Sequence, residues 1–142
     1  EQPASDRRMF HDGLGVVTVL IPDALELEPG LVAAGAVALP YETERGLAGA
    51  IEALAATDIV SVLVEAGPRL FGSLMSAGFV DELVLIHAGG LGGEEAPALY
   101  VGEPQQDPST LVRPLRAVEA GIVGDDAVTV WRPRLTDGQG TE

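Results

Sequence analysis

Runs of β-branched residues and one helical repeat of apolar residues organise the first third of the chain. Residues 15–22 and 35–41 are apolar runs bounded by glycine and proline, and both predict strands. Residues 29–34, which lie between these runs, predict one or two helical turns. Over residues 46–57 leucine and isoleucine recur at positions i, i+4 and i+7 with alanines between them, which predicts an amphipathic helix.

The middle of the chain carries the most continuous apolar segment. Ile59–Glu65 (IVSVLVE) predicts a strand, and its nearly unbroken apolar character is typical of a strand buried on both faces of a parallel sheet. Gly67 can cap the helix that follows, Pro68 suits its first turn, and Gly78 is a good C-terminal stop. Residues 83–89 (LVLIHAG) predict another buried strand.

The last third contains a glycine-rich loop at residues 89–102 and one or two strands within residues 111–123. A turn signal at residues 124–126 leads into a strand at 127–132, and residues 134–142 are expected to form a flexible tail. The order of elements predicts an α/β fold whose mixed, partly parallel sheet is flanked by helices and has an antiparallel C-terminal portion. Because no linker or repeat interrupts residues 1–142, we expect a single domain.

Composition narrows the possible chemistry. The 142 residues include no cysteine and two histidines, which excludes disulfides and zinc–thiolate sites and argues against a metal site. The 22 acidic and eight basic residues give a formal charge of −14, so neither nucleic acid nor an anionic membrane is an expected partner. No apolar run approaches the ~20 residues of a membrane span. A phosphorylated ligand would need a local device such as a helix N-terminus.

The segment from Ser61 to Gly78 is the strongest candidate for a site. The predicted strand would deliver Glu65 to its carboxyl end, where ligands bind in α/β sheets. The free N–H groups of the new helix favour an anion, and Arg69 adds a positive charge in its first turn. The alternative is an ordinary connection between strand and helix, with both side chains in solvent. Residues 67–73 lack the lysine of a phosphate-binding P-loop.

His87 has two interpretations as well. It lies in an apolar strand, so a satisfied core or interface histidine is favoured over a catalytic one.

The chain from Val60 to Gly93 resembles the C-terminal part of the riboflavin-biosynthesis reductase domain, found in the bifunctional deaminase–reductase and in stand-alone pyrimidine reductases. The resemblance rests on three pieces, which are Val64-Glu65-Ala66-Gly67-Pro68, residues 77–83 (AGFVDEL) and Leu91-Gly92-Gly93, and on the similar ending at Gly124-Asp125-Asp126.

That family implies a dihydrofolate-reductase-like fold, a cytoplasmic homodimer, and use of NADPH to reduce the ribosyl group of a phosphorylated aminopyrimidine. By resemblance, Glu65 lines the substrate and nicotinamide region and is the catalytic candidate. Ala66, Gly67, Pro68, Arg69 and Leu70 would border the cofactor. Ala66 replaces the first glycine of the family's pair.

The resemblance also implies that about the first half of the reductase domain is missing from this sequence, and that it would have to be supplied elsewhere. Two alternatives therefore stand beside the reductase. The chain could be a non-catalytic relative or fragment that acts as a dimerisation or ligand-binding module. It could also be a reductase of the same fold that acts on another pterin-like or pyrimidine-like ring.

Overall fold

The structure is a computed structural model, and it divides the chain into two compact units, Glu1–Leu63 and Val64–Glu142. The prediction of a single domain over residues 1–142, or of the second half of one, stays a prediction. The residues that the structure describes are 2–90, 92–93, 96, 98–101 and 114–134.

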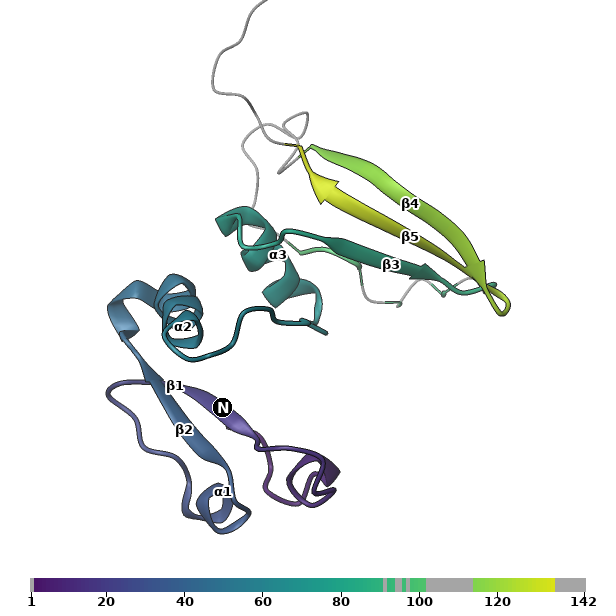
Figure 1. Cartoon of the computed structure of the whole chain (residues 1–142). Coiled ribbons are helices and arrows are strands. Elements are labelled where there is room, and N and C mark those ends of the chain that lie inside the picture. The colour runs from purple at the N-terminus through teal and green to yellow at the C-terminus, as the bar shows by residue number, and fades with distance from the viewer. Residues whose placement is uncertain (1, 91, 94–95, 97, 102–113, 135–142) are drawn as a thin grey trace, which may run out of the picture. The chain divides into compact units, whose positions relative to one another are not determined.

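A parallel pair of strands forms the frame of the first unit (Figure 1). β1 (Thr18–Pro22) pairs in parallel with β2 (Val37–Tyr41), and α1 (Pro29–Ala33) lies in the connection between them. Parallel strands need such a crossover because the chain must return to the same end of the sheet. Both predicted strands and the predicted helical turns are confirmed, although each strand is shorter than its apolar run.

The helix of the first unit packs against the end of β2. α2 (Gly46–Ala55) follows the short 3-10 helix η2 (Thr43–Arg45), and another 3-10 turn, η1 (Arg8–Phe10), precedes β1. The helix approaches the preceding segment closely at Gly49, where a Cβ atom would lie 2.9 Å from the carbonyl oxygen of Glu42. Among the described residues of this unit, four apolar side chains are buried, and they are Ile21, Leu31, Ala36 and Ala50.

The second unit begins with a helix whose two ends are set by its sequence. α3 (Pro68–Ala77) starts with proline in its first turn and ends at Gly78, which has the left-handed conformation (φ +80°). The N–H of Phe79 donates to the carbonyl oxygen of Leu74 at 3.0 Å, which closes a Schellman-type cap. Leu74 and Met75 are buried. The predicted helix is therefore confirmed at both ends.

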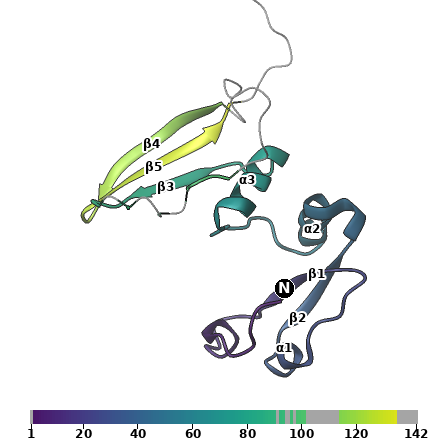
Figure 2. The ribbon, with the colours of Figure 1, turned by 180° about the vertical axis from the view of Figure 1, so that it is seen from behind.

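A three-stranded antiparallel sheet completes the second unit (Figure 2). Its order is β3–β5–β4, formed by β3 (Leu83–His87), β4 (Leu115–Val123) and β5 (Asp126–Pro133). A two-residue turn that begins at Gly124 (φ +62°) joins the last two strands, as its turn signal predicts. The α/β fold class with parallel and antiparallel strands is confirmed, but in the described residues these strands lie in two separate sheets.

The strand predicted at Ile59–Glu65 is wrong for this structure. These residues form neither helix nor strand, and their side chains are exposed except where the turn begins at Ala66. The composition favours a buried strand, but a strand is a paired structure and its ladder needs a neighbour. Among the described residues β1 and β2 pair only with each other, so this segment has no strand beside it.

Parts of three predictions lie outside the described residues. They are part of the glycine-rich loop at 89–102, the beginning of the 111–123 segment and the tail from 135 onward. Across the part of the chain that the structure describes, no helix is long and apolar enough to cross a membrane.

Candidate functional site

The turn that leads into α3 is the candidate site, and its backbone is that of an open helix start. Gly67 precedes the helix in an extended conformation (φ −67°, ψ 167°), and its carbonyl oxygen accepts the N–H of Phe71 at 3.0 Å. Pro68 occupies the first turn, where its missing N–H costs no hydrogen bond. The residue before the helix provides no side-chain cap.

The backbone N–H groups in the first turn of α3 are suited to bind an anion. The N–H groups of Arg69 and Leu70 belong to the first turn of α3, where intrahelical acceptors are absent by geometry. Arg69 is exposed and the first turn itself contains no acidic residue, while the exposed Glu65 lies three residues before Pro68. Helix N-termini of this kind bind phosphate and other anions through N–H groups and the helix dipole.

Glu65 stands directly before this helix start, but not at the end of a strand as predicted. Its side chain is exposed, Ala66 is half-buried, and a Cβ atom added at Gly67 would meet nothing within 4 Å. The six predicted site residues therefore form one continuous, accessible turn.

A distant segment, which no local pattern predicts, supports this turn. The N–H of Val101 donates to the carbonyl oxygen of Pro68 at 3.1 Å. The ring of Tyr100 packs edge-on against Phe71 with centroids 6.1 Å apart, and its hydroxyl lies 3.4 Å from Ser76 Oγ. An aromatic residue within a glycine-rich loop was the only signal that could have pointed to this contact.

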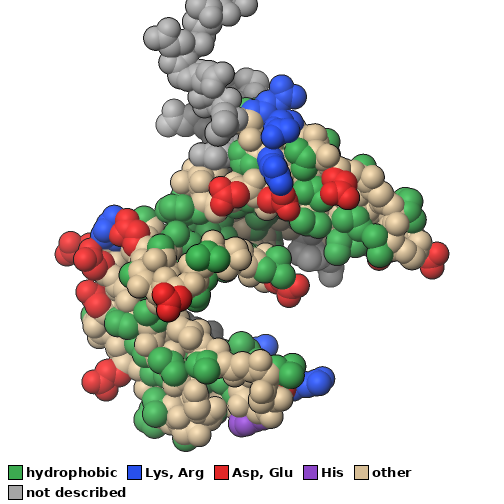
Figure 3. Space-filling model, viewed as in Figure 1, with side chains coloured by type: hydrophobic (Ala, Val, Ile, Leu, Met, Phe, Trp, Pro, Cys, Tyr) green, Lys and Arg blue, Asp and Glu red, His purple; other side chains and the backbone are tan. Residues whose placement is uncertain are grey.

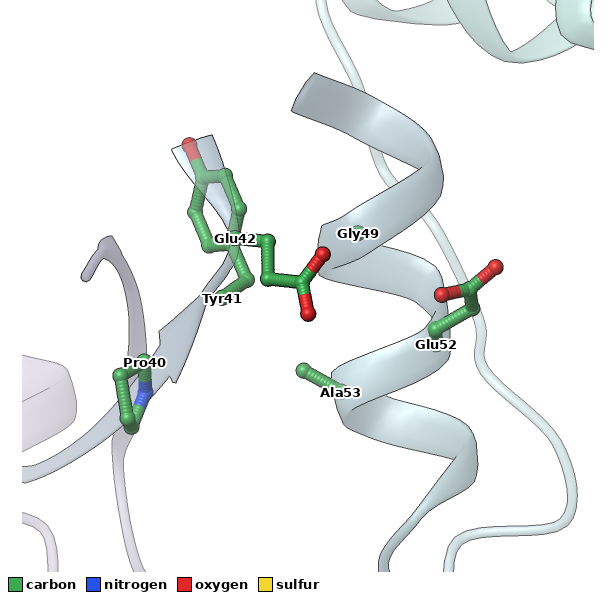
Figure 4. Close-up of a pocket in the computed structure, with 6 residues that line it drawn as sticks. All are labelled: Pro40, Tyr41, Glu42, Gly49, Glu52 and Ala53. Atoms are coloured by element: carbon green, nitrogen blue, oxygen red, sulfur yellow. The ribbon is translucent and has the colours of Figure 1, made fainter. Parts of the chain in front are cut away.

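A shallow pocket lies in the first unit, between the end of β2 and α2 (Figure 4). Its volume is about 260 Å³. The lining residues are Pro40, Tyr41, Glu42, Gly49, Glu52 and Ala53. Glu42 and Glu52 give it a negative character, which Arg45 offsets in part through an ion pair with Glu52. Its charge therefore disfavours the phosphorylated ligand that the helix start would attract.

His87 and Trp131 share one hydrogen-bonding partner on the second sheet. Thr129 Oγ1 accepts the indole N–H of Trp131 at 3.0 Å and lies 3.2 Å from His87 Nε2. His87 is exposed, so it is not a core histidine in this structure, and the interpretation as an interface histidine stays a prediction. Within the described ranges, no three His, Asp or Glu side chains gather where they could hold a metal ion.

Acidic side chains are spread over the surface and do not form one cluster on the face that Figure 3 shows. Figure 3 shows acidic side chains scattered over the visible face, with apolar side chains reaching the surface between them. At the start of α3 one basic and one acidic side chain, Arg69 and Glu65, are both exposed.

Solved structures of similar fold include proteins from two bacteria. RibD of Acinetobacter baumannii matches in two crystal forms, with TM-scores of 0.65 and 0.66, 19% and 20% identity, and 83% of this chain covered in each. A pyrimidine reductase-like protein from Corynebacterium diphtheriae matches with a TM-score of 0.64 and 20% identity over 82% of this chain. The chain spans only 31% of the length of the RibD protein and 50% of the reductase-like protein.

The sequence comparisons give one family. No curated protein matches the chain. The pattern of the RibD C-terminal domain matches residues 37–129, which include β2, both longer helices, the candidate turn and most of the second sheet. The chain belongs to the RibD C-terminal domain family.

Proposed function

We propose that this chain is part of a reductase of riboflavin biosynthesis, in which NADPH reduces the ribosyl group of a phosphorylated aminopyrimidine. The observation that carries the proposal is the start of α3 at Gly67–Leu70, which has no side-chain cap and has Arg69 in its first turn, in a member of the RibD C-terminal domain family. Because the chain spans half or less of its structural relatives, the activity belongs to the complete fold and not to these residues alone.

The residues of the turn fit the phosphates of a pyridine nucleotide. Gly67 leaves open space where a side chain would stand, so a phosphate can approach the backbone closely. The N–H groups of the first turn would donate to phosphate oxygens, and the guanidinium of Arg69 would add a charge-assisted hydrogen bond. When bound, the nucleotide supplies the hydride.

The other residues of the turn would orient the reactants. Glu65 comes three residues before Pro68, the first residue of α3, so a ligand held by the helix would place its remaining atoms within reach of this carboxylate. We propose that Glu65 accepts hydrogen bonds from the substrate or the nicotinamide amide. The resemblance-based prediction of a homodimer stays part of this proposal.

The first experiment is a titration of the 142-residue chain with NADPH, followed by nucleotide fluorescence. Stoichiometric binding is the expected result. Arg69→Gln should weaken binding about tenfold, since one charge-assisted hydrogen bond contributes ~1.5 kcal/mol or more. Arg116→Gln on β4 is the matched control, because it removes an equally charged, exposed arginine of the same unit. Equal affinities of the two variants would contradict the phosphate-binding role of the turn.

The role of Glu65 needs a turnover assay in a protein that has the complete fold. Glu65→Gln keeps the side-chain size but removes the charge, and it should lower kcat/KM for NADPH oxidation. Asp81→Asn, which neutralises an exposed acid just after α3, is the control. Unchanged turnover in Glu65→Gln would show that this carboxylate has no part in the reaction.

A non-catalytic binding or dimerisation module is the second candidate. Two observations favour it, namely the short span of the chain relative to its structural relatives and the methyl group of Ala66 beside the nucleotide turn. The same titration separates the two candidates. A chain that binds no NADPH at high ligand concentration fits the module, and Ala66→Gly then tests whether the methyl group is the obstacle.

A further inference from the structure

The segment that follows β3 meets α3 through both backbone and side-chain contacts. The N–H of Val101 donates to the carbonyl oxygen of Pro68 at 3.1 Å, at the first residue of the helix. The ring of Tyr100 packs edge-on against the ring of Phe71, with their centroids 6.1 Å apart. The hydroxyl oxygen of Tyr100 lies 3.4 Å from Ser76 Oγ. We call Tyr100 and Val101 the brace of α3.

The brace acts mainly on the first turn of the helix. Pro68 is the first residue of α3, and Phe71 provides the N–H that donates to the carbonyl oxygen of Gly67 at 3.0 Å. This hydrogen bond joins the residue before the helix to the first turn. The contact at Ser76, near the other end of the helix, is at the upper limit of hydrogen-bond length and is the weakest of the three. The ring contact and the first hydrogen bond of the helix therefore both depend on Phe71.

The start of α3 needs such support because its own sequence gives it little. The residue before the helix provides no side-chain cap, and that residue is a glycine, which has the greatest conformational freedom of any residue. Helix ends also fray. A Cβ atom added at Gly67 would meet nothing within 4 Å, so the turn is open to a ligand. A contact from a distant segment therefore restricts a turn that local interactions leave free to open.

This restraint bears on the proposed nucleotide site, and the inference rests on the proposed function. The N–H groups of Arg69 and Leu70 can hold a phosphate only while the first turn is helical. The apparent affinity for a ligand falls in proportion to the fraction of molecules that are in the binding-competent conformation. Tyr100 would therefore raise the affinity for the nucleotide by acting through Phe71 rather than on the nucleotide itself.

We propose that Tyr100 is a positioning residue. By packing on Phe71 it holds the start of α3 in the conformation that the phosphates of the nucleotide require. The alternative is that Tyr100 only adds to the stability of the second unit, as any packed aromatic ring does. The two differ along the helix, because a general loss of stability opens both ends, whereas loss of the brace opens the start of α3 alone.

The first readout needs no ligand. It is hydrogen exchange of single backbone amides, followed by NMR in the natural chain and in Tyr100→Ala. We expect the Phe71 amide to exchange about two- to tenfold faster in the variant, which is the size of effect that loss of an edge-on aromatic pair has on an equilibrium. The Phe79 amide, which donates to the carbonyl oxygen of Leu74 at the other end of the helix, is the internal control and should be unchanged.

The second readout is NADPH titration. Tyr100→Ala should weaken binding by the same factor of about two to ten, whereas Tyr100→Phe keeps the ring and should bind as the natural chain does. Phe79→Ala removes an aromatic side chain at the other end of α3, and the affinity should stay unchanged. Tyr100→Leu keeps the apolar volume without the edge-on contact, so it is the second variant and should shift both readouts in the same direction by less. Urea unfolding followed by Trp131 fluorescence shows that each variant is folded.

Two outcomes would overturn the proposal while the natural chain binds NADPH. The Phe71 and Phe79 amides could be accelerated equally in Tyr100→Ala, which means that the ring only stabilises the unit. Phe79→Ala could also weaken NADPH binding as much as Tyr100→Ala does. If the natural chain binds no NADPH, the proposed function fails, and the Phe71 amide alone decides about the brace. Faster exchange of that amide in Tyr100→Ala then supports the positioning of the helix start, and unchanged exchange overturns it.

Discussion

Substitution by alanine should affect the free energy of unfolding differently at the two glycines that flank α3, and their backbone conformations give the reason. Gly67 has φ −67° and open space around a virtual Cβ, so alanine fits its conformation. Gly78 has φ +80° in the cap at the other end, a conformation that alanine adopts at a cost of ~1–2 kcal/mol. One glycine is thus dispensable for the fold and the other is not.

The magnitudes follow from the two conformations. At Gly67, alanine gains ~0.4–1 kcal/mol by restricting the unfolded chain and loses a comparable amount as a poorer helix cap, so the net change is about zero. At Gly78 the same gain offsets only part of the left-handed cost, which leaves a loss of about 1 kcal/mol. Gly78→Asn should fall between glycine and alanine, since asparagine tolerates this conformation better.

The assay for folding is urea unfolding followed by the fluorescence of Trp131, the single tryptophan of the chain, which lies on β5 in the same unit as α3. A loss of 1 kcal/mol lowers the midpoint by about 0.3–1 M. The assay for the ligand is NADPH titration. Gly67→Ala should weaken binding by about tenfold or more, equivalent to ~1.4 kcal/mol, because its methyl group stands where the phosphates approach.

Three results would refute these assignments. If Gly67→Ala binds NADPH as tightly as the natural chain, the ligand does not approach the backbone at this turn. If Gly78→Ala unfolds at an unchanged urea concentration, the left-handed cap is not what ends α3. The reverse pattern would contradict both assignments. In that pattern Gly67→Ala unfolds at a lower urea concentration and Gly78→Ala binds NADPH more weakly.

Three further predictions concern the first unit. Leu31→Ala should cost ~2–5 kcal/mol because Leu31 is 0% exposed, whereas Val32→Ala on the same helix should cost less than about 0.5 kcal/mol; urea unfolding by circular dichroism measures both. Gly49→Ala should cost ~1–3 kcal/mol in the same assay, because its Cβ atom would press on a backbone oxygen 2.9 Å away. The hydroxyl and N–H of Thr43 lower the pKa of Asp23 below its ordinary 3.8, so the stability this pair contributes is present above that pH and lost as the pH falls through the lowered pKa. Thr43→Val should return the pKa toward its ordinary value in an NMR titration of the carboxylate, and an unchanged titration would contradict the role of the hydroxyl.

The candidate turn could be predicted from the sequence because its determinants are adjacent. Proline in the first turn of α3 and glycine after its last residue act within a few residues of the chain, so they specify the helix ends in almost any context. The choice of Glu65 to Leu70 as the site rests on this local pattern together with the family resemblance, and their roles stay a proposal. Their proposed chemistry also depends on how the bound nucleotide and substrate are placed, which these six residues alone do not specify.

The tertiary structure decided the features that depend on contacts between segments far apart in the sequence. The apolar run at Ile59–Glu65 has the composition of a buried strand, yet strand formation needs a second backbone at hydrogen-bonding distance, and local pattern cannot say whether one is present. The support that Tyr100 and Val101 give to α3 joins segments about 30 residues apart, beyond any local periodicity. Sequence thus determined the elements whose interactions are local, and the fold alone decided which strands find a neighbour.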